Sequence, residues 1–182
     1  MDNFKLEVSN DVILRLMTEE DAQIQFDTIQ KNKEFLREYL NWVDKVITIQ
    51  DTLDKIKLDR ENFEKGESLE LGIFYKNKFV GRVGFHEIIE RSAEIGYWLD
   101  QDYNGLGIMT QCVKVITDYG IKNLKKHRIV IKMDVSNIPS QSIPKRLGFI
   151  YEGTERESSI TLDNEWRSSE VWSFLENDKF SM

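Results

Sequence analysis

The amino-acid sequence predicts an α/β (α+β) protein with a mixed, mostly antiparallel central sheet and helices on both of its faces. Three observations predict this class. Apolar residues follow helical spacing in the first third of the chain, residues 68–99 hold three successive strand-like runs, and the remainder alternates strands with helices. The interval from Leu99 to Arg128 is long enough for one crossover helix between parallel strands.

Size and composition predict one soluble domain over residues 1–182. The chain is 40% hydrophobic and 11% aromatic, which is enough to fill one core. Its net charge of -7 argues against direct nucleic-acid binding and suits a cationic substrate. The single cysteine, Cys112, leaves no disulfide framework and no metal site. A cytoplasmic protein is expected, because the N-terminus lacks a signal-peptide pattern and no run approaches the ~20 apolar residues of a membrane span.

The first third of the chain is expected to be mostly helical. Leu6–Leu16 reads as two short strands around the turn pair Asn10-Asp11. Thr18 then caps a helix that continues to about Lys31, with acidic residues in its first turn. Two further helices follow, one with its apolar face over Phe35–Val43 and one over Thr52–Lys65. Gly66 is placed as the C-cap of the latter.

The rest of the chain is expected to alternate between strands and helices. Two runs from Ser68 onward form a hairpin around Asn77, and Ala93–Leu99 adds a third strand. A helix with Cys112 on its apolar stripe then ends near Gly120. The final elements are a strand over Arg128–Val135, a short helix near Ser140–Arg146, and two strands paired around Asp163-Asn164.

The stretch D-Y-N-G-L-G-I-M-T-Q, Asp102 to Gln111, joins a strand to a helix. A lone G-x-G pattern is often only a turn. Here, however, the amides of residues 106–110 would be unpaired donors at a helix N-terminus, and Gly105 and Gly107 would let a phosphate approach the backbone. The stretch matches neither the P-loop nor the dinucleotide fingerprint. It therefore predicts another phosphate-bearing cofactor.

Four motifs carry a resemblance to a known family. They are L-R-L-M-T-E-E-D-A, K-N-K-E-F-L-R-E-Y-L-N-W, G-Y-W-L-D-Q-D-Y-N-G-L-G-I-M-T-Q-C with V-G-R-V-G-F before it, and N-I-P-S-Q-S-I-P-K-R-L-G-F-I-Y-E-G. In this order the chain resembles the GCN5-related N-acetyltransferase (GNAT) superfamily, and within it the ribosomal-protein-serine/alanine (Rim-type) N-acetyltransferases. The resemblance implies the GNAT acyl-CoA N-acyltransferase fold, acetyl-CoA as cofactor, and a splayed strand at Trp98 and Leu99.

The resemblance also implies which residues bind the cofactor. They are Trp98, Leu99, Asn104, Gly105, Leu106, Gly107, Ile108, Met109, Thr110, Asn137 and Ser140. Two positions depart from the family pattern. Asn104 stands where glutamine or arginine is usual, so a donor is kept and a charge is lost. Met109 stands where glycine or alanine is usual, which backbone contacts tolerate if the side chain points to the core.

Glu94 and Ser140 are the expected catalytic residues. Glu94 is the first candidate for the base, acting directly or through water, and its alternative is an exposed strand acid. The resemblance gives Ser140 the role of protonating the departing thiolate, while Asn137 and Ser140 also suit helix capping. The family's glutamate base falls on Ser159, with Glu157 two residues earlier. The base is therefore Glu94, Glu157 or no dedicated residue.

The expected reaction is direct acetyl transfer, in a ternary complex, to an amine. The N-terminal α-amino group of a protein, ribosomal by resemblance, is the leading acceptor. A polyamine or other small cationic amine is the second reading, and a CoA-binding module with little turnover is the third. His86 and His127 have no serine or cysteine partner pattern, so a hydrolase triad is not indicated. The last strands are where a homodimer or higher homo-oligomer would pair.

Overall fold

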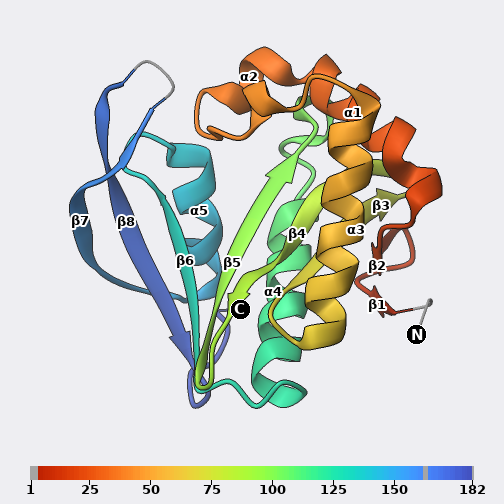
Figure 1. The fold of residues 1–182 in the computed structure, drawn as a ribbon. Helices are drawn as coiled ribbons and strands as arrows, with labels where there is room; N and C mark the ends of the chain where they lie inside the picture. The colour runs from red at the N-terminus through yellow and green to blue at the C-terminus, as the bar shows by residue number, and fades with distance from the viewer. Residues whose placement is uncertain (1–3, 162–163, 182) are drawn as a thin grey trace.

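The computed structural model describes residues 4–161 and 164–181, and its centre is one mixed sheet (Figure 1). Within these residues the sheet has eight strands in the order β1-β2-β3-β4-β5-β6-β8-β7, and only the β5–β6 pair is parallel. The strands are β1 (Lys5–Glu7), β2 (Val12–Leu16), β3 (Leu69–Tyr75), β4 (Lys78–Ile88), β5 (Ser92–Leu99), β6 (Arg128–Asp134), β7 (Ile150–Ile160) and β8 (Trp166–Leu175). The predicted fold class is confirmed.

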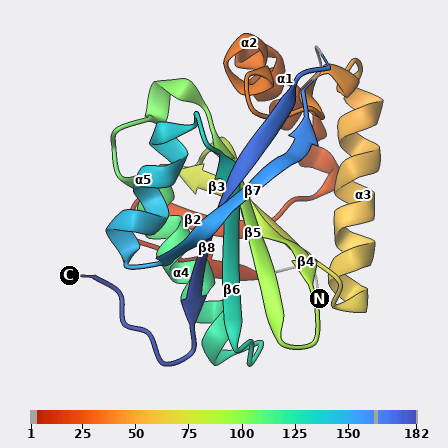
Figure 2. The same cartoon turned by 90° about the vertical axis from the view of Figure 1, so that its left-hand side faces the viewer.

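Helices cover both faces of the sheet. They are α1 (Ala22–Lys31), α2 (Lys33–Arg37), α3 (Ile49–Lys65), α4 (Ile108–Lys122) and α5 (Ile138–Leu147). Figure 2 shows α3 on one side of the strands and α4 with α5 on the other. The contacts agree, since α1 packs on β4 and α3 on β3, whereas α4 packs on β4, β5 and β6 and α5 on β6 and β7. The crossover from β5 through α4 to β6 is the predicted one.

The N-terminal elements follow the predicted order with two corrections. The Thr18 backbone N–H and hydroxyl donate to Asp21 at 2.8 and 3.0 Å, and a 3-10 turn, Glu19–Asp21, precedes α1. The helix predicted over Phe35–Val43 is wrong in length, because α2 stops at Arg37 and a 3-10 turn follows at Val43–Lys45. Burial explains the break: Leu36 and Val43 both point into the small core beneath α1 and α3.

Helix α3 begins at Ile49, three residues before the predicted start. The Asp51 carboxylate accepts from the Thr48 backbone N–H at 2.7 Å, which supplies the cap. Its predicted C-cap is confirmed, since Gly66 has a left-handed φ of +73°. Similarly, α5 begins at Ile138, earlier than predicted, because the Asn137 side chain accepts from Ser140 N at 3.1 Å.

The strand pairs that the sequence predicts are all present. Lys76 and Asn77 adopt φ of +48° and +65°, which closes the β3–β4 hairpin. Strands β7 and β8 are antiparallel, and β8 lies between β6 and β7. The predicted centre of that pairing includes Asp163, which lies outside the described residues. None of the described helices is long and apolar enough to cross a membrane.

Strand β5 divides the core into two halves by the alternation of its side chains. Ile95 and Leu99 join the larger cluster toward α4, whereas Trp98 joins the smaller cluster toward α1 and α3. Cys112 is fully buried in the larger cluster, and burial raises the pKa of its thiol to about 12. It therefore packs as a core residue.

Candidate active site

Strands β5 and β6 separate halfway along their length. Their parallel register runs from Ser92 opposite Arg128 to Ile95 opposite Ile131 and stops there, although β6 continues to Asp134. The upper part of β5 is thus splayed away from β6, as the resemblance implies. Backbone groups that would pair with β6 in a regular sheet are left at the edge of an opening.

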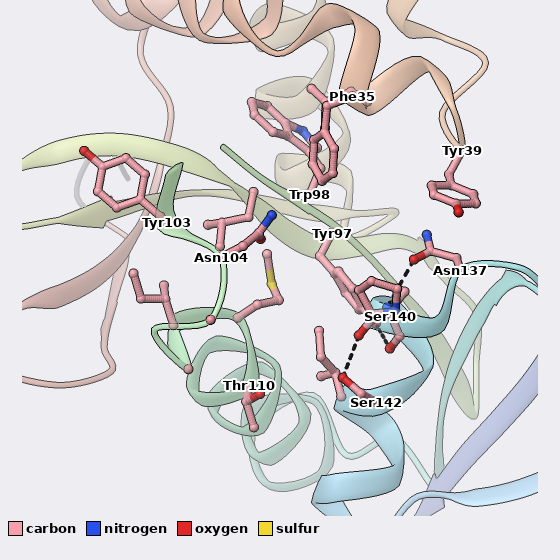
Figure 3. Close-up of a pocket in the computed structure, with 18 of the residues that line it drawn as sticks. Phe35, Tyr39, Tyr97, Trp98, Tyr103, Asn104, Thr110, Asn137, Ser140 and Ser142 are labelled. Atoms are coloured by element: carbon pink, nitrogen blue, oxygen red, sulfur yellow. Dashed lines mark hydrogen bonds between the residues drawn. The ribbon is translucent and has the colours of Figure 1, made fainter. Parts of the chain in front are cut away.

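A cavity of about 670 Å³ opens on the side of the splay that carries the glycine loop, and we call it the loop-side cavity (Figure 3). It is lined by Phe35, Leu36, Tyr39, Leu40, Tyr97, Trp98, Leu99, Tyr103, Asn104, Gly105, Gly107, Ile108, Met109, Thr110, Gln111, Asn137, Pro139, Ser140, Ser142, Ile143 and Arg146. Every residue predicted to bind the cofactor lines it except Leu106, whose side chain points to solvent and is 57% exposed.

The glycine loop has the geometry of an anion cradle. Gly105 and Gly107 have φ of +79° and +74°, and Gly107 is the N-cap of α4. A Cβ on Gly105 would meet nothing within 4 Å, and one on Gly107 would meet only the Gln111 amide nitrogen at 3.9 Å. Open space therefore lies over the first-turn amides, which a phosphate group fits. Met109 is 7% exposed, so the bulky departure from the family pattern points into the core.

Arg146 brings a cation to this loop that sequence reasoning did not single out. Its Nη1 donates to the Thr110 hydroxyl at 2.8 Å, which joins α5 to the first turn of α4. Asn104 lacks the charge that the family often places in the loop. Arg146 supplies a positive charge at the first turn of α4, from a position 36 residues after Thr110 in sequence. No spacing in the sequence signals this contact.

Ser140 is held against Tyr97 at the splay. Its hydroxyl donates to Tyr97 Oη at 2.9 Å, and Tyr97 Oη donates to the Ser140 carbonyl at 3.1 Å (Figure 3). The capping bond to Asn137 uses the Ser140 backbone N–H, so the hydroxyl is not needed for the cap. Burial raises the pKa of Tyr97, so its hydroxyl stays protonated at neutral pH. Capping and a chemical role for Ser140 are therefore compatible.

A second cavity of about 680 Å³ lies on the other side of the splay, toward α1 and α3, and we call it the helix-side cavity. Six residues line both cavities: Tyr39, Leu40, Tyr97, Trp98, Asn137 and Ser140. They form a shared wall. Trp42 adds to the aromatic surface of the helix-side cavity, with its ring centroid 6.2 Å from that of Trp98. Two molecules could therefore meet across this wall.

The structure does not bring the two predicted catalytic residues together. Ser140 lines both cavities, whereas Glu94 lines neither of them. The Glu94 carboxylate lies 3.2 Å from His86 Nε2 and 3.9 Å from Lys132 Nζ, beside a polar cavity of about 480 Å³ on the open face of the sheet. Glu157 is exposed on β7, outside both the loop-side and helix-side cavities. The base assignment stays a prediction.

Comparison with known proteins agrees with this geometry. Residues 11–150 match the family described as acetyltransferase (GNAT) domain. The chain is 29% identical over 160 residues to the ribosomal-protein-serine acetyltransferase of Escherichia coli (strain K12), covering 87% of this chain and 89% of that protein.

Two solved structures share the fold over nearly the whole chain. One is RimL, a ribosomal L7/L12 alpha-N-protein acetyltransferase in complex with coenzyme A, with a TM-score of 0.91 and 25% identity over 96% of this chain and 100% of that one. The other is the microcin C7 self immunity acetyltransferase MccE in complex with acetyl-CoA and AMP, with a TM-score of 0.89 and 28% identity over 93% and 95% of the two chains. The protein belongs to the GNAT acetyltransferase family, and the enzyme class predicted from its sequence is confirmed.

Proposed function

We propose that this protein is an acetyl-CoA-dependent N-acetyltransferase that modifies the N-terminal α-amino group of a protein, with ribosomal proteins as the first candidates. One observation carries the proposal: the loop-side and helix-side cavities share a wall at the splay of β5. A cofactor in one cavity and an amine in the other would meet at Tyr97, Trp98 and Ser140. This arrangement supports direct attack in a ternary complex, because neither reactant has to cross the sheet.

The loop-side cavity has the groups that acetyl-CoA requires. The cofactor supplies an acetyl group activated as a thioester. Amides of residues 105–110 and the Arg146 guanidinium would hold its pyrophosphate, because amide donors and a cation both stabilise phosphate charge. The splayed backbone at Trp98 and Leu99 would hold the pantetheine arm, with Asn137 on the opposite wall.

The residues of the shared wall would have different roles in the reaction. The Ser140 hydroxyl would give its proton to the leaving sulfur, and Tyr97 Oη would keep that hydroxyl oriented. An α-amino group has a pKa of ~7.7–8.0, so it needs less help from a base than a lysine does. Glu94 lies outside the helix-side cavity. Glu94 could therefore act as the base only if another group, lining that cavity, passed the proton to it.

The charges of the helix-side cavity favour a protein N-terminus over a polyamine. Its lining has four carboxylates, Asp51, Asp54, Glu70 and Asp134, and four cations, Lys45, Lys55, Arg82 and Lys132. A polycation gains little from such a balanced lining. A single ammonium beside Tyr39, Trp42 and Trp98 gains cation–π attraction. The names of the E. coli relative and of RimL point to the same class of acceptor.

Release of free thiol from acetyl-CoA tests this function. The purified protein is incubated with acetyl-CoA and either peptides with a free N-terminus, the same peptides with a blocked N-terminus, or spermidine. We expect thiol only with free N-termini, and mass spectrometry should place the added acetyl on the α-amine. Thiol with spermidine alone would select the small-amine alternative. Tight CoA binding without thiol from any acceptor would leave a binding module.

Ser140→Ala tests the proton donor. We expect kcat to fall ~100-fold, the low end of general acid catalysis, while the affinity for CoA stays within about twofold. The helix should survive because its cap uses the Ser140 backbone N–H. Ser142→Ala is the matched control, since that hydroxyl lines the same cavity but donates to the Pro139 carbonyl at 2.7 Å. Wild-type kcat in Ser140→Ala would remove Ser140 from the mechanism.

Two further expectations concern the whole protein. A cytoplasmic location remains a prediction from the sequence. Pairing between copies is also a prediction, and the edge strand β7 supplies the surface for it, since β8 pairs with only one of its edges. Light scattering of the purified protein measures the oligomeric state. A monomer at all concentrations would contradict the predicted pairing between copies.

A further inference from the structure

A third cavity, of about 480 Å³, lies on the same face of the sheet as the helix-side cavity, toward the start of β5, and we call it the open-face cavity. It is lined by Glu87, Ser92, Glu94, Arg128, Val130, Lys132, Glu152, Gly153, Thr154, Glu155 and Val171. The helices of this face lie elsewhere, since α1 packs on β4 and α3 on β3. Figures 1 and 2 show β5 and β6 uncovered between α3 and the β7–β8 hairpin. This part of the sheet is therefore open to a partner.

The open-face cavity continues the helix-side cavity. Lys132 lines both of them. Glu94 lines the open-face cavity, and its carboxylate is 3.2 Å from Nε2 of His86, which lines the helix-side cavity. Beyond the end of β6, Arg167 Nη1 donates to the Glu38 carbonyl at 2.9 Å, which ties β8 to the segment after α2. A polypeptide with its N-terminus in the helix-side cavity thus has its open path over the first half of β5 and β6.

The length of this path determines which acceptor residues reach the open-face cavity. Tyr97 of the shared wall lies three residues after Glu94 and five residues after Ser92. An extended polypeptide advances ~3.3 Å per residue, as β5 itself does. An acceptor whose α-amine lies at Tyr97 and whose chain runs back along β5 therefore places its residue 4 over Glu94 and its residue 6 over Ser92.

A β-bulge brings two carboxylates together in this cavity. The register of β4 and β5 shifts at His86, so that Phe85 lies opposite Ile95 while Glu87 lies opposite Glu94. Bulges commonly re-aim side chains beside functional sites. Like charges directly opposite each other on neighbouring antiparallel strands destabilise the pair. A cation that lies between the two carboxylates removes this cost.

The cations of the cavity already have other partners. Arg128 Nη2 is 2.5 Å from Glu152 Oε2, and Lys132 Nζ is 2.9 Å from Glu155 Oε1. Glu87 forms no ion pair within the part of the chain that the structure describes. With four carboxylates and two cations in its lining, the cavity has an excess of negative charge. A lysine or arginine side chain suits this field, and an acidic side chain does not.

We propose that the open-face cavity binds residues 4–6 of the acceptor polypeptide and favours lysine or arginine there. This inference rests on the proposed function, because it takes the acceptor to be a protein with its N-terminus at the shared wall. The cationic end of such a side chain would lie between Glu87 and Glu94. Val130 and Val171 would contact its aliphatic part. The cavity adds no group to the reaction and acts on acceptor affinity alone.

Three acceptor peptides test this preference. They are identical except at residues 4–6, which are all lysine, all glutamine or all glutamate. We expect KM for the lysine peptide to be ~5-fold below that for the glutamine peptide, and KM for the glutamate peptide to be the highest, with similar kcat for all three. The differences should shrink at high salt, because the cavity is open to solvent. Equal KM for the three peptides would overturn the proposal.

Glu87→Gln tests the location. Glu87 is exposed, so the variant should fold, and the preference for lysine should fall to about twofold or less with the Kd for CoA unchanged. Glu90→Gln is the matched control, because it removes the same charge from the turn after β4 but lines none of the three cavities. It should keep the preference. Wild-type preference in folded Glu87→Gln would overturn the proposal.

A binding measurement makes the same comparison without turnover. Fluorescence anisotropy gives the Kd of the three peptides in their N-acetylated form, with the protein saturated with CoA. The lysine peptide should bind ~5-fold more tightly than the glutamine peptide, and equal Kd values would overturn the proposal. Dimers that dissociate in Glu87→Gln, detected by light scattering, would assign this face to a second copy and also overturn it. No thiol release by the wild type, with the Glu87-dependent lysine preference retained in binding, would reject the proposed function and still support this site.

Discussion

The two cavities that meet at β5 are built in different ways. The loop-side cavity is formed largely by two continuous segments, 97–111 and 137–146, and it includes the backbone of the glycine loop at the N-terminus of α4. The helix-side cavity takes side chains from many elements, between Gln25 on α1 and Ser140 on α5. Backbone groups are the same whatever the residue, whereas side chains change with each substitution. The comparison suggests a constant cofactor half and an adaptable acceptor half.

The relatives fit this division. RimL and MccE share the fold of this chain at TM-scores of 0.91 and 0.89, and both structures contain CoA or acetyl-CoA. Their printed names differ in role, one a ribosomal protein acetyltransferase and the other a self immunity acetyltransferase. A common fold with different named roles is what a variable second cavity allows. Variants that disturb only one cavity test whether the halves are separable.

Gly107→Val should have the largest effect, on the loop-side cavity. A β-branched residue at φ +74° is strained by about 1–3 kcal/mol, and its side chain projects into the cradle, so the Kd for CoA should rise ~30-fold or more. Gly66→Val is the matched control, because Gly66 has φ +73° and open space but lies at the end of α3. Equal CoA affinity in the two variants, measured by calorimetry, would contradict a cofactor-binding role for the glycine loop.

Trp42→Ala should have an intermediate effect, confined to the helix-side cavity. Losing this aromatic wall should raise KM for the peptide about tenfold, equivalent to about 1.4 kcal/mol. The Kd for CoA should stay within about twofold, because Trp42 does not line the loop-side cavity. Trp166→Ala controls for loss of an exposed tryptophan, since Trp166 is 64% exposed on β8. A matching rise in the Kd for CoA would show that the halves are coupled.

Arg146→Gln should have the smallest of the three effects. One charge-assisted hydrogen bond contributes about 1 kcal/mol at an exposed position, so the Kd for CoA should rise ~5-fold. The difference from wild type should shrink at high salt, because the contact is exposed. Lys145→Gln removes the neighbouring charge, which does not line the cavity, and should change little. An equal rise in the Kd for CoA in Arg146→Gln and Lys145→Gln would mean that only the general positive charge of this surface matters, and not the contact of Arg146.

The same contrast explains which parts of the site could be predicted. Gly105 and Gly107 are recognisable because a left-handed backbone and an open cradle both require glycine. Asn137 is recognisable as a cap from the residues beside it. Arg146 carried no such signal. Its role depends on Thr110, which the fold brings close from another helix.

The fold shows the same limit. Apolar periodicity predicted the strands, four of the helices and the crossover, because burial of one face follows from local spacing. It failed at α2, where Leu36 and Val43 reach the same small core although no single helix joins them. It also did not place β8 between β6 and β7, since strand order depends on pairing between distant segments.

The sequence by itself thus determined the fold class, the family resemblance and the position of the two-glycine loop before α4, because each depends on residues close together along the chain. Only the tertiary structure decided where β5 and β6 separate, and therefore that two cavities share one wall. It also placed the Glu94 carboxylate beside His86 and outside the lining of the helix-side cavity. The physical reason is that catalysis depends on distances between side chains, and those distances are set by packing across the sheet.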